Sequence, residues 1–353
     1  MKKSVLRTVS SVINRDFNGK LILVVSAMKG VTDLLIKAFD EHNPEILSEA
    51  LSLYVDEAVD LGLNPYARFL ELIGEELRRF INLREPWIRD YVIIHGELLS
   101  AMLIEGVLND ILNIRAKAVY EPGLVTNQNW GGAEVIHELS RDRVRAMYPD
   151  LLRKYDVLVV PGFLGVTLDG RYSSLGRGGS DYTASLLASY LNASRLTFYT
   201  DSGGLLSGDP SIVNDPVLIR DVCYEEAHAA SIVGVKKFHP RTFEPLLRSR
   251  VLTLITSPWA EDGTYVSNRC VEAPKIVNLG VTRDRGYKVS VIGYGIARNE
   301  NFVSEIKDIS SSYGIKNLMR DGDHVVSIIS NGKNDDAIRL VRELHGWVRK
   351  WVG

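Results

Sequence analysis

The chain has 353 residues, enough for about two domains. Its hydrophobic share of 45% and charged share of 24% are ordinary for globular proteins, which excludes disordered and low-complexity classes. The formal net charge of −2 argues against a nucleic-acid partner held by bulk positive charge. No uninterrupted apolar run approaches the roughly 18 residues of a membrane helix, and Arg7, Ser10 and Ser11 interrupt any signal peptide, so we expect no membrane partner.

The chain has two cysteines, Cys223 and Cys270. Two are too few for a disulfide framework or a cysteine-based metal site, so we expect reduced thiols and no metal ligands. No pair of histidines has metal-ligand spacing either. These observations indicate a cytoplasmic protein.

The hydrophobic pattern predicts an amphipathic helix over residues 4–17 and then a strand at 21–25 that is buried on both faces. Helical patterns broken near Pro65 and Pro86 fill residues 45–113. Further strands are expected in four apolar runs, with helices between them: residues 116–120, 157–160, 196–199 and 252–255. This alternation favours an α/β fold, a three-layer αβα sandwich with a mainly parallel sheet.

The pattern changes near Pro274. Two strands, at 288–292 and 325–329, are then each followed by a helix, over 301–313 and 335–350. We therefore expect a separate small α+β module over residues 273–353.

A glycine-rich turn at residues 175–184 runs directly into an apolar-faced helix. Glycines let the backbone approach a ligand closely, and the free N–H groups at a helix start attract an anion. Arg177 inside the turn is suited to grip a carboxylate or phosphate. The alternative is an ordinary turn in which Ser180 or Asp181 caps the helix.

Two segments in the first half are further candidates. Residues 26–32 follow a predicted strand, and ligands gather at the carboxyl ends of strands in open α/β sheets. The alternative is a plain turn with Thr32 as helix cap. Residues 95–97 lie in a helix or a short strand, where Glu97 would hold a substrate ammonium or be an ordinary solvated glutamate.

Two more candidates lie in the second half. The strand at 196–199 ends in Thr200-Asp201 and opens a glycine-containing loop that would receive a nucleotide or simply turn the chain. After a predicted helix over 224–233, Lys236 and its neighbours form either a basic site or a solvated charged patch.

Taken in order, these segments resemble aspartate kinases of the amino-acid kinase superfamily, over residues 1 to about 270. The matching segments are residues 24–28, 30–32, 95–97, 123–126, 161–165, 176–184, 200–201, 209–210, and 236 with 239–242. The module from 273 to 353 resembles an ACT domain, the small amino-acid-sensing fold attached to these kinases, and residues 276–281 would lend it an edge strand.

The resemblance implies transfer of the γ-phosphoryl group of ATP to the β-carboxylate of L-aspartate. The product is 4-phospho-L-aspartate, the first step toward lysine, threonine and methionine. A carboxylate acceptor is already ionised near pH 7, so no general base is required. Catalysis then depends on positioning and on neutralising negative charge. Mg²⁺ would be carried mainly by nucleotide oxygens and water.

The resemblance also implies roles for single residues. Arg177 would grip a substrate carboxylate, Glu97 would bind the α-ammonium, and Asp181 would orient the glycine loop and the metal-bound phosphates. Ser26 and Thr32 would line the aspartate site. ATP would be held by Gly178, Gly179, Ser180, Thr200, Asp201 and Lys236, and the catalytic residues would be Arg177, Asp181 and Lys236.

The chain departs from the family in two places. The family opens with a strand and a Lys-Phe-Gly-Gly-Thr-Ser loop, which a kinase domain over residues 1–272 would lack. Either this loop lies upstream of Met1, or the chain is a non-catalytic, amino-acid-sensing relative, and we expect no turnover from residues 1–353 alone. The loop after Thr200 also lacks an acidic residue and a tyrosine, and an arginine is missing after Pro210, compared with the family. A kinase of another small amino-acid carboxylate is a further alternative.

Residues 273–353 have room for one ACT unit, where the family often carries two. ACT units usually pair across a dimer, so the resemblance implies a homodimer through this module. We expect weak or no inhibition by lysine or threonine.

Overall fold

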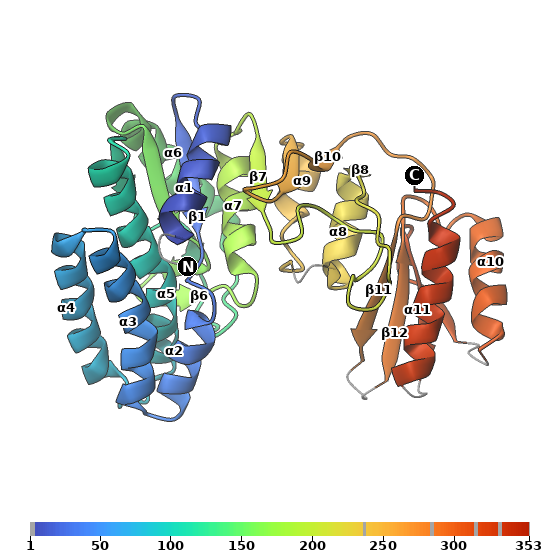
Figure 1. Cartoon of the computed structure of the whole chain (residues 1–353), viewed down its shortest axis with the longest axis horizontal. Helices are drawn as coiled ribbons and strands as arrows, with labels where there is room; N and C mark the ends of the chain where they lie inside the picture. Colours follow the sequence, from blue (N-terminus) through green and yellow to red (C-terminus); the bar gives the residue numbers. More distant parts are fainter. Residues whose placement is uncertain (1–3, 236–237, 283–285, 314–316, 331–333, 353) are drawn as a thin grey trace. The chain divides into compact units, whose positions relative to one another are not determined.

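The computed structural model describes residues 4–235, 238–282, 286–313, 317–330 and 334–352. The chain divides into two compact units, Met1–Leu191 and Asn192–Gly353 (Figure 1). The domain boundary expected near residue 272 lies inside the second unit and stays a prediction.

The first unit begins with a long helical region. Its elements are α1 (Ser4–Asp16), β1 (Leu21–Val25), α2 (Val31–Asp40), α3 (Pro44–Asp60), α4 (Asn64–Phe80), α5 (Pro86–Gly106), a π-helical turn η1 (Val107–Ile111), β2 (Ala116–Ala118), β3 (Val125–Thr126), α6 (His137–Lys154), β4 (Val157–Pro161), β5 (Leu164–Thr167), β6 (Tyr172–Ser174) and α7 (Gly179–Tyr190). Helices α3, α4 and α5 each carry proline in the first turn. Proline is tolerated there because backbone N–H groups in the first turn form no hydrogen bond within the helix. The helix breaks expected near Pro65 and Pro86 are therefore confirmed.

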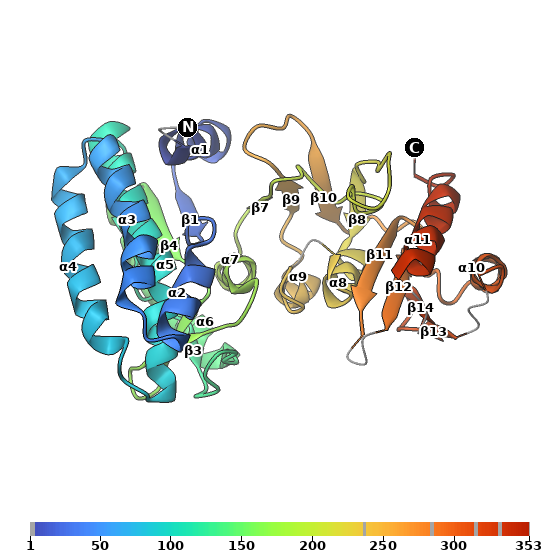
Figure 2. The ribbon, with the colours of Figure 1, turned by 60° about the horizontal axis from the view of Figure 1, so that its bottom comes forward.

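The central sheet of the first unit has the strand order β1-β4-β2, and both pairings are parallel. Alternate residues of β4 face opposite sides: Val157 and Val159 join the core formed with α1–α5, whereas Leu158 and Val160 join the core formed with α6 and α7. Figure 2 shows α3 and α4 on one side of β1 and β4 and α7 on the other. The expected αβα layering is present in this unit.

Strand β1 differs from the expectation. Its bounds are those predicted, but only Val25 is buried, and the other four residues are half-buried. The physical reason is its place at the edge of the three described strands, where it pairs with β4 alone.

Helix α5 also corrects the sequence argument about apolar runs. With η1 it forms 26 residues, Pro86–Ile111, that are long and apolar enough to cross a membrane by length and composition, and the mean hydropathy of the most apolar 18-residue window is 1.5. Asp90, His95 and Glu97 interrupt the run and hid it in the sequence. In the structure 78% of its most apolar window is buried, as expected for the core helix of a folded domain.

The second unit contains two sheets. Its first elements are β7 (Leu196–Tyr199), β8 (Asp221–Cys223), α8 (Tyr224–Ile232), α9 (Glu244–Ser249), β9 (Thr253–Thr256) and β10 (Gly263–Ser267). These strands have the order β7-β9-β10-β8, in which the outer two pairings are parallel and the β9–β10 pairing is antiparallel. The expected mainly parallel character holds here too.

The C-terminal part of the second unit forms the other sheet. Its elements are β11 (Ile276–Val281), β12 (Tyr287–Ile292), α10 (Glu300–Ser311), β13 (Leu318–Arg320), β14 (Val325–Ser330) and α11 (Asn334–Val348). All pairings in the order β11-β12-β14-β13 are antiparallel. Val289 and Val291 of β12 pack with Phe302 of α10 and Leu344 of α11, so both helices cover one face. The expected α+β arrangement, with residues 276–281 as an edge strand, is confirmed, whereas its being a separate domain stays a prediction.

Candidate active site

The carboxyl end of β1 lies against the middle of α5, which brings two of the candidate segments together. The backbone N–H of Ala27 donates to Glu97 Oε1 at 3.2 Å. The Tyr54 hydroxyl accepts from the N–H of Met28 at 2.9 Å and donates to the carbonyl oxygen of Gly96 at 2.7 Å. A Cβ atom on Gly96 would lie 2.7 Å from Ala27 Cβ, so this approach requires glycine. Residues 26–32 and 95–97 therefore form one structure.

Glu97 is a buried acidic side chain in this structure. It is only 4% exposed, and its Oε2 atom has no hydrogen-bond partner among the described residues. Burial raises the pKa of its carboxyl group to about 8. The alternative of a solvated helix glutamate is therefore wrong. A buried carboxyl oxygen without a partner is suited to receive a cationic ligand group.

The glycine-rich turn reaches the same end of β1. The N–H of Gly162 donates to the carbonyl oxygen of Val25 at 2.9 Å, and a Cβ atom on Gly162 would lie 2.6 Å from Ser180 Cβ. Gly162 and Phe163 form the loop between β4 and β5. The N–H of Phe163 donates to Thr183 Oγ1 at 3.2 Å, which connects this loop to the first turns of α7. The start of α7 is thus positioned next to the end of β1.

The helix caps differ from those considered in the sequence. The N-cap residue of α7 is Gly178 with φ of 75°, and that of α2 is Gly30 with φ of 85°. Both are left-handed conformations that favour glycine. Neither helix has a side-chain cap, so Thr32, Ser180 and Asp181 lie inside the helices rather than capping them. The N–H of Gly179 donates to the carbonyl oxygen of Gly176 at 3.0 Å. The N–H of Ser180, at the next position of this first turn, is therefore the one on offer to an anion.

Two charged side chains lie at this turn. Arg177 is 92% exposed, and its guanidinium approaches the exposed Asp33 carboxylate at 3.6 Å. Such an exposed pair contributes little to stability, so Arg177 can exchange Asp33 for a ligand at small cost. Asp181 lies in the first turn of α7, and burial raises its pKa to about 6.

Sequence reasoning missed two residues that brace this structure. Asp90 is 1% exposed and accepts hydrogen bonds from the N–H groups of Gly131, at 3.0 Å, and Ser174, at 2.8 Å, just before the glycine turn. An acidic residue within an apolar helical pattern was a readable signal for it. Tyr54 had no such signal, because its position reads as an ordinary core residue of α3.

The predicted nucleotide residues lie in the second unit. Thr200 follows β7, and its N–H donates to the carbonyl oxygen of Thr256 at 2.7 Å, whereas Asp201 is exposed. Gly204 has a φ of 150°, which L side chains rarely adopt, and a Cβ atom there would lie 2.4 Å from Leu218 Cδ1, so the loop favours glycine at this position. Thr200 and Asp201 thus follow the carboxyl end of a strand, a usual place for ligands. Lys236 lies outside the described residues, and the ATP-binding roles of all three stay predictions.

Comparison with known proteins places the chain in a class. The model of the amino acid kinase family matches residues 2–257, and the chain belongs to this family. Among curated proteins, the lysine-sensitive aspartokinase 3 of Escherichia coli is 28% identical over 322 residues, which cover 87% of this chain and 70% of that protein. The aspartokinase of Rickettsia felis is 25% identical over 337 residues, 93% of this chain and 69% of the relative.

Solved structures agree on the fold. The chain is similar to E. coli aspartokinase III in complex with aspartate and ADP, with a TM-score of 0.85 and 22% identity, over 97% of this chain and 95% of that one. The same enzyme in complex with lysine and aspartate gives a TM-score of 0.68 and 24% identity, over 98% of this chain and 80% of that one. The predicted amino-acid kinase fold is confirmed.

Proposed function

We propose that this protein is an aspartate kinase that transfers the γ-phosphoryl group of ATP to the β-carboxylate of L-aspartate, giving 4-phospho-L-aspartate. The aspartokinases among its relatives support this assignment, since their similarity extends over most of the chain. Amino-acid biosynthesis toward lysine, threonine and methionine is the corresponding place in metabolism.

The observation that carries the proposal is Glu97. A zwitterionic substrate needs an anionic group for its ammonium and donors for its carboxylates. Glu97 offers a buried carboxyl oxygen that no described residue satisfies, beside the end of β1. The start of α7, with Arg177, offers N–H donors and positive charge to carboxylates at the same strand end. Ser26 precedes Ala27, Thr32 lies in the first turn of α2, and both would line the site.

The chemical step fits these groups. The aspartate β-carboxylate is itself the nucleophile, so the protein has to align it with the γ-phosphorus and stabilise charge on the transferring group. Arg177 and the N–H groups of Gly178 and Ser180 would do so, because donors fixed before the reaction need no reorientation. Thr200, Asp201 and Lys236 would hold the nucleotide.

Mg²⁺ would accompany ATP. Beside the glycine turn, Asp181 is half-buried at the start of α7 and belongs to no cluster of metal-binding side chains among the described residues. This fits a hard cation held mainly by phosphate oxygens and water. Bound there, the ion would neutralise phosphate charge, while Asp181 would orient the glycine turn.

The remaining proposals concern the C-terminal module and the location. A four-stranded antiparallel sheet with two helices on one face supports an ACT-like regulatory domain, through which two chains would form a homodimer. ATP as a substrate and two cysteines that are free thiols support a cytoplasmic location.

The test is an assay with Mg-ATP in which the acyl phosphate is trapped by hydroxylamine. It uses residues 1–353 and a version that carries the family's strand and Lys-Phe-Gly-Gly loop ahead of Met1. We expect aspartate-dependent hydroxamate from the longer version, and none when glutamate or succinate replaces aspartate. Hydroxamate with glutamate but not aspartate would contradict the substrate assignment.

A second function is favoured by the loop after Thr200, which lacks acidic and aromatic residues that the family carries. On this alternative the chain is a non-catalytic relative that binds an amino acid without phosphorylating it. Tight aspartate binding by both versions, without hydroxamate from either, would support this alternative and refute the kinase.

A further inference from the structure

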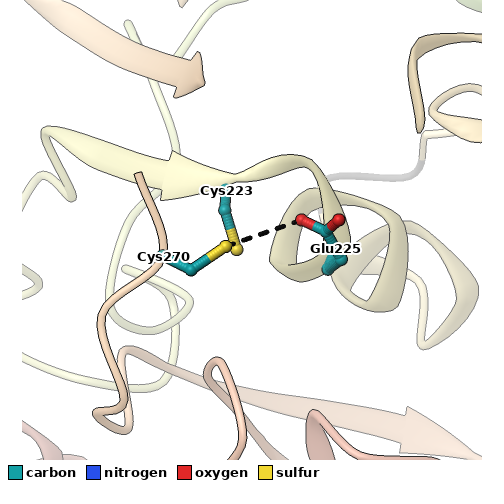
Figure 3. A group of neighbouring side chains, drawn as sticks. All are labelled: Cys223, Glu225 and Cys270. Carbon is teal, nitrogen blue, oxygen red and sulfur yellow. Dashed lines mark hydrogen bonds between the residues drawn. The ribbon is translucent and has the colours of Figure 1, made fainter. Parts of the chain in front are cut away.

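The two cysteines of the chain, which the proposed function does not use, come together with a carboxylate in the second unit. Cys223 ends β8, Glu225 lies in the first turn of α8, and Cys270 lies between β10 and β11. Their two Sγ atoms and one carboxylate oxygen all lie within 4.8 Å of one another, and the Cys270 thiol donates to Glu225 Oε2 at 3.6 Å. Figure 3 shows the three side chains pointing toward one point.

The backbone around this cluster is firmly held. Strand β10 pairs with β8 in parallel, with Ser267 opposite Cys223, so the segment that carries Cys270 leaves the sheet beside Cys223. The N–H of Cys223 donates to Glu226 Oε2 at 2.7 Å, and Lys275 forms a buried ion pair with the same carboxylate at 2.9 Å. The residues on both sides of Cys270 are thus anchored to β8 and α8, and the three donor atoms are close together before any ligand binds.

Glu225 uses its two oxygens differently. Arg250 donates to Oε1 at 2.7 Å and lies over the ring of Tyr224, while Oε2 faces the thiol of Cys270. The carboxylate can therefore bind a cation through Oε2 and keep its bond to Arg250 through Oε1. Carboxylates that bind metal ions in proteins are usually held in place by a hydrogen bond to another protein group.

We propose that Cys223, Cys270 and Glu225 bind a thiolate-preferring divalent cation, with Zn²⁺ as the natural occupant and a water molecule as fourth ligand. In a tetrahedral zinc site with Zn–S bonds of about 2.3 Å, the two sulfur atoms lie less than 4.8 Å apart. The observed separations of the donor atoms, all within 4.8 Å, therefore suit such a site. Two soft sulfur donors disfavour Mg²⁺ and Ca²⁺, which prefer oxygen ligands. On binding, both thiols lose their protons to solvent, so one Zn²⁺ replaces two protons.

The proposed site differs from the expectation that two cysteines are too few for metal binding. That argument counted cysteines alone, whereas a carboxylate from a neighbouring helix supplies the third ligand. Because Cys223 and Cys270 belong to segments far apart in the sequence, their spacing gave no signal. A bound ion would tie the segment between β10 and β11 to the start of α8.

The experiment uses the full chain, reduced with a phosphine and stripped of metal by a chelator, in the absence of ATP. Co²⁺ is titrated in as the probe, since thiolate ligands give a cobalt charge-transfer band in the near ultraviolet. We expect one equivalent to produce this band, Zn²⁺ to displace it, and excess Mg²⁺ to leave it unchanged. Zn²⁺ should also raise the unfolding temperature of the full chain.

Three variants decide the assignment. Cys270→Ser, at a partly exposed position, should abolish the band and the Zn²⁺-dependent rise in unfolding temperature, and Glu225→Gln should weaken binding by about tenfold or more. The matched control is Glu300→Gln, another glutamate paired with an arginine (Arg320, 2.7 Å), which should leave binding unchanged. A missing band in the reduced wild-type chain, or a band that survives Cys270→Ser, would overturn the proposal.

Discussion

The two regions that the resemblance assigns to the two substrates are built differently. In the first unit, the segments around Glu97 and Ser180 are held by hydrogen bonds that Tyr54 and Gly162 donate to backbone carbonyl oxygens and that Asp90 accepts from backbone N–H groups. In the second unit, the loop after Thr200 is held by backbone bonds and a close-packed glycine, and Asp201 is exposed.

This difference separates two kinds of specificity. A small zwitterion offers few atoms, so discrimination requires buried, fixed groups whose loss is costly. A nucleotide phosphate is recognised largely by backbone N–H groups and charge, which an open glycine loop can supply. Substitutions in the first unit should therefore change aspartate binding sharply, and those beside Thr200 should change ATP binding mildly.

The largest effect is expected from Glu97→Gln. Aspartate affinity should fall by at least about a hundredfold, because removing one partner of a buried charge pair costs about 3–5 kcal/mol. The affinity for ATP should be unchanged, and calorimetric titration with each ligand measures both affinities. The matched control is Glu105→Gln, on the same helix and also buried at 8% exposure, which bonds to Lys117. Equal loss of both ligands, or of neither, would refute the role of Glu97.

Gly162→Ala tests the contact between the β4–β5 loop and the glycine turn. The added Cβ would lie 2.6 Å from Ser180 Cβ, so the start of α7 has to move. We expect the free energy of unfolding to fall by about 1–3 kcal/mol and aspartate binding to weaken, measured by urea titration and calorimetry. Gly132→Ala is the control, since its Cβ would meet nothing within 4 Å. Identical behaviour of the two variants would contradict this account.

The pH dependence of aspartate binding follows from the raised pKa of Glu97, about 8. In the free protein Glu97 is therefore protonated at pH 7. Because the folded state holds this proton more tightly than the unfolded chain does, the contribution of Glu97 to the free energy of unfolding is fully present below pH 4.5 and is lost as the pH rises through 8. The ammonium requires the carboxylate, so binding releases a proton. Affinity should rise about tenfold per pH unit toward pH 8 and then level off. A flat profile in the wild type, like that expected of Glu97→Gln, would count against the assignment.

A smaller effect is expected from Tyr54→Phe, which removes the hydroxyl between Met28 and Gly96. The N–H of Met28 loses its acceptor, at a cost of about 1 kcal/mol, and aspartate affinity should fall about fivefold. Tyr148→Phe is the control, because its buried hydroxyl donates to the carbonyl oxygen of Pro122 away from the site. If both variants lose stability but neither loses affinity, Tyr54 has no positioning role.

The sequence predicted most elements of the fold because hydrophobic period and proline placement are local signals. Helix α5, for example, begins at Pro86, and β4 is an unbroken apolar run. Burial of β1 was misjudged, since an apolar run cannot reveal whether a strand lies at a sheet edge. The caps of α2 and α7 were misjudged because left-handed glycines replaced the side-chain caps.

The sequence predicted the motifs of the site but not the packing that holds them in place. Residues 26–32, 95–97 and 176–184 were identified along the chain, and the structure brings them to one strand end. The buried state of Glu97 depends on α5 packing against β1, which one sequence does not report. The cluster of Cys223, Glu225 and Cys270 was missed for the same reason, because pairing of β8 with β10 creates it.

The most direct test of the central claim pairs two ligands with two proteins. Aspartate and succinate, which differ by the amino group, are each titrated into the wild-type chain and into Glu97→Gln. If Glu97 holds the α-ammonium, the wild type should prefer aspartate by about a hundredfold, and this preference should vanish in the variant. An equal preference in both proteins would show that Glu97 does not recognise the ammonium and would contradict the account.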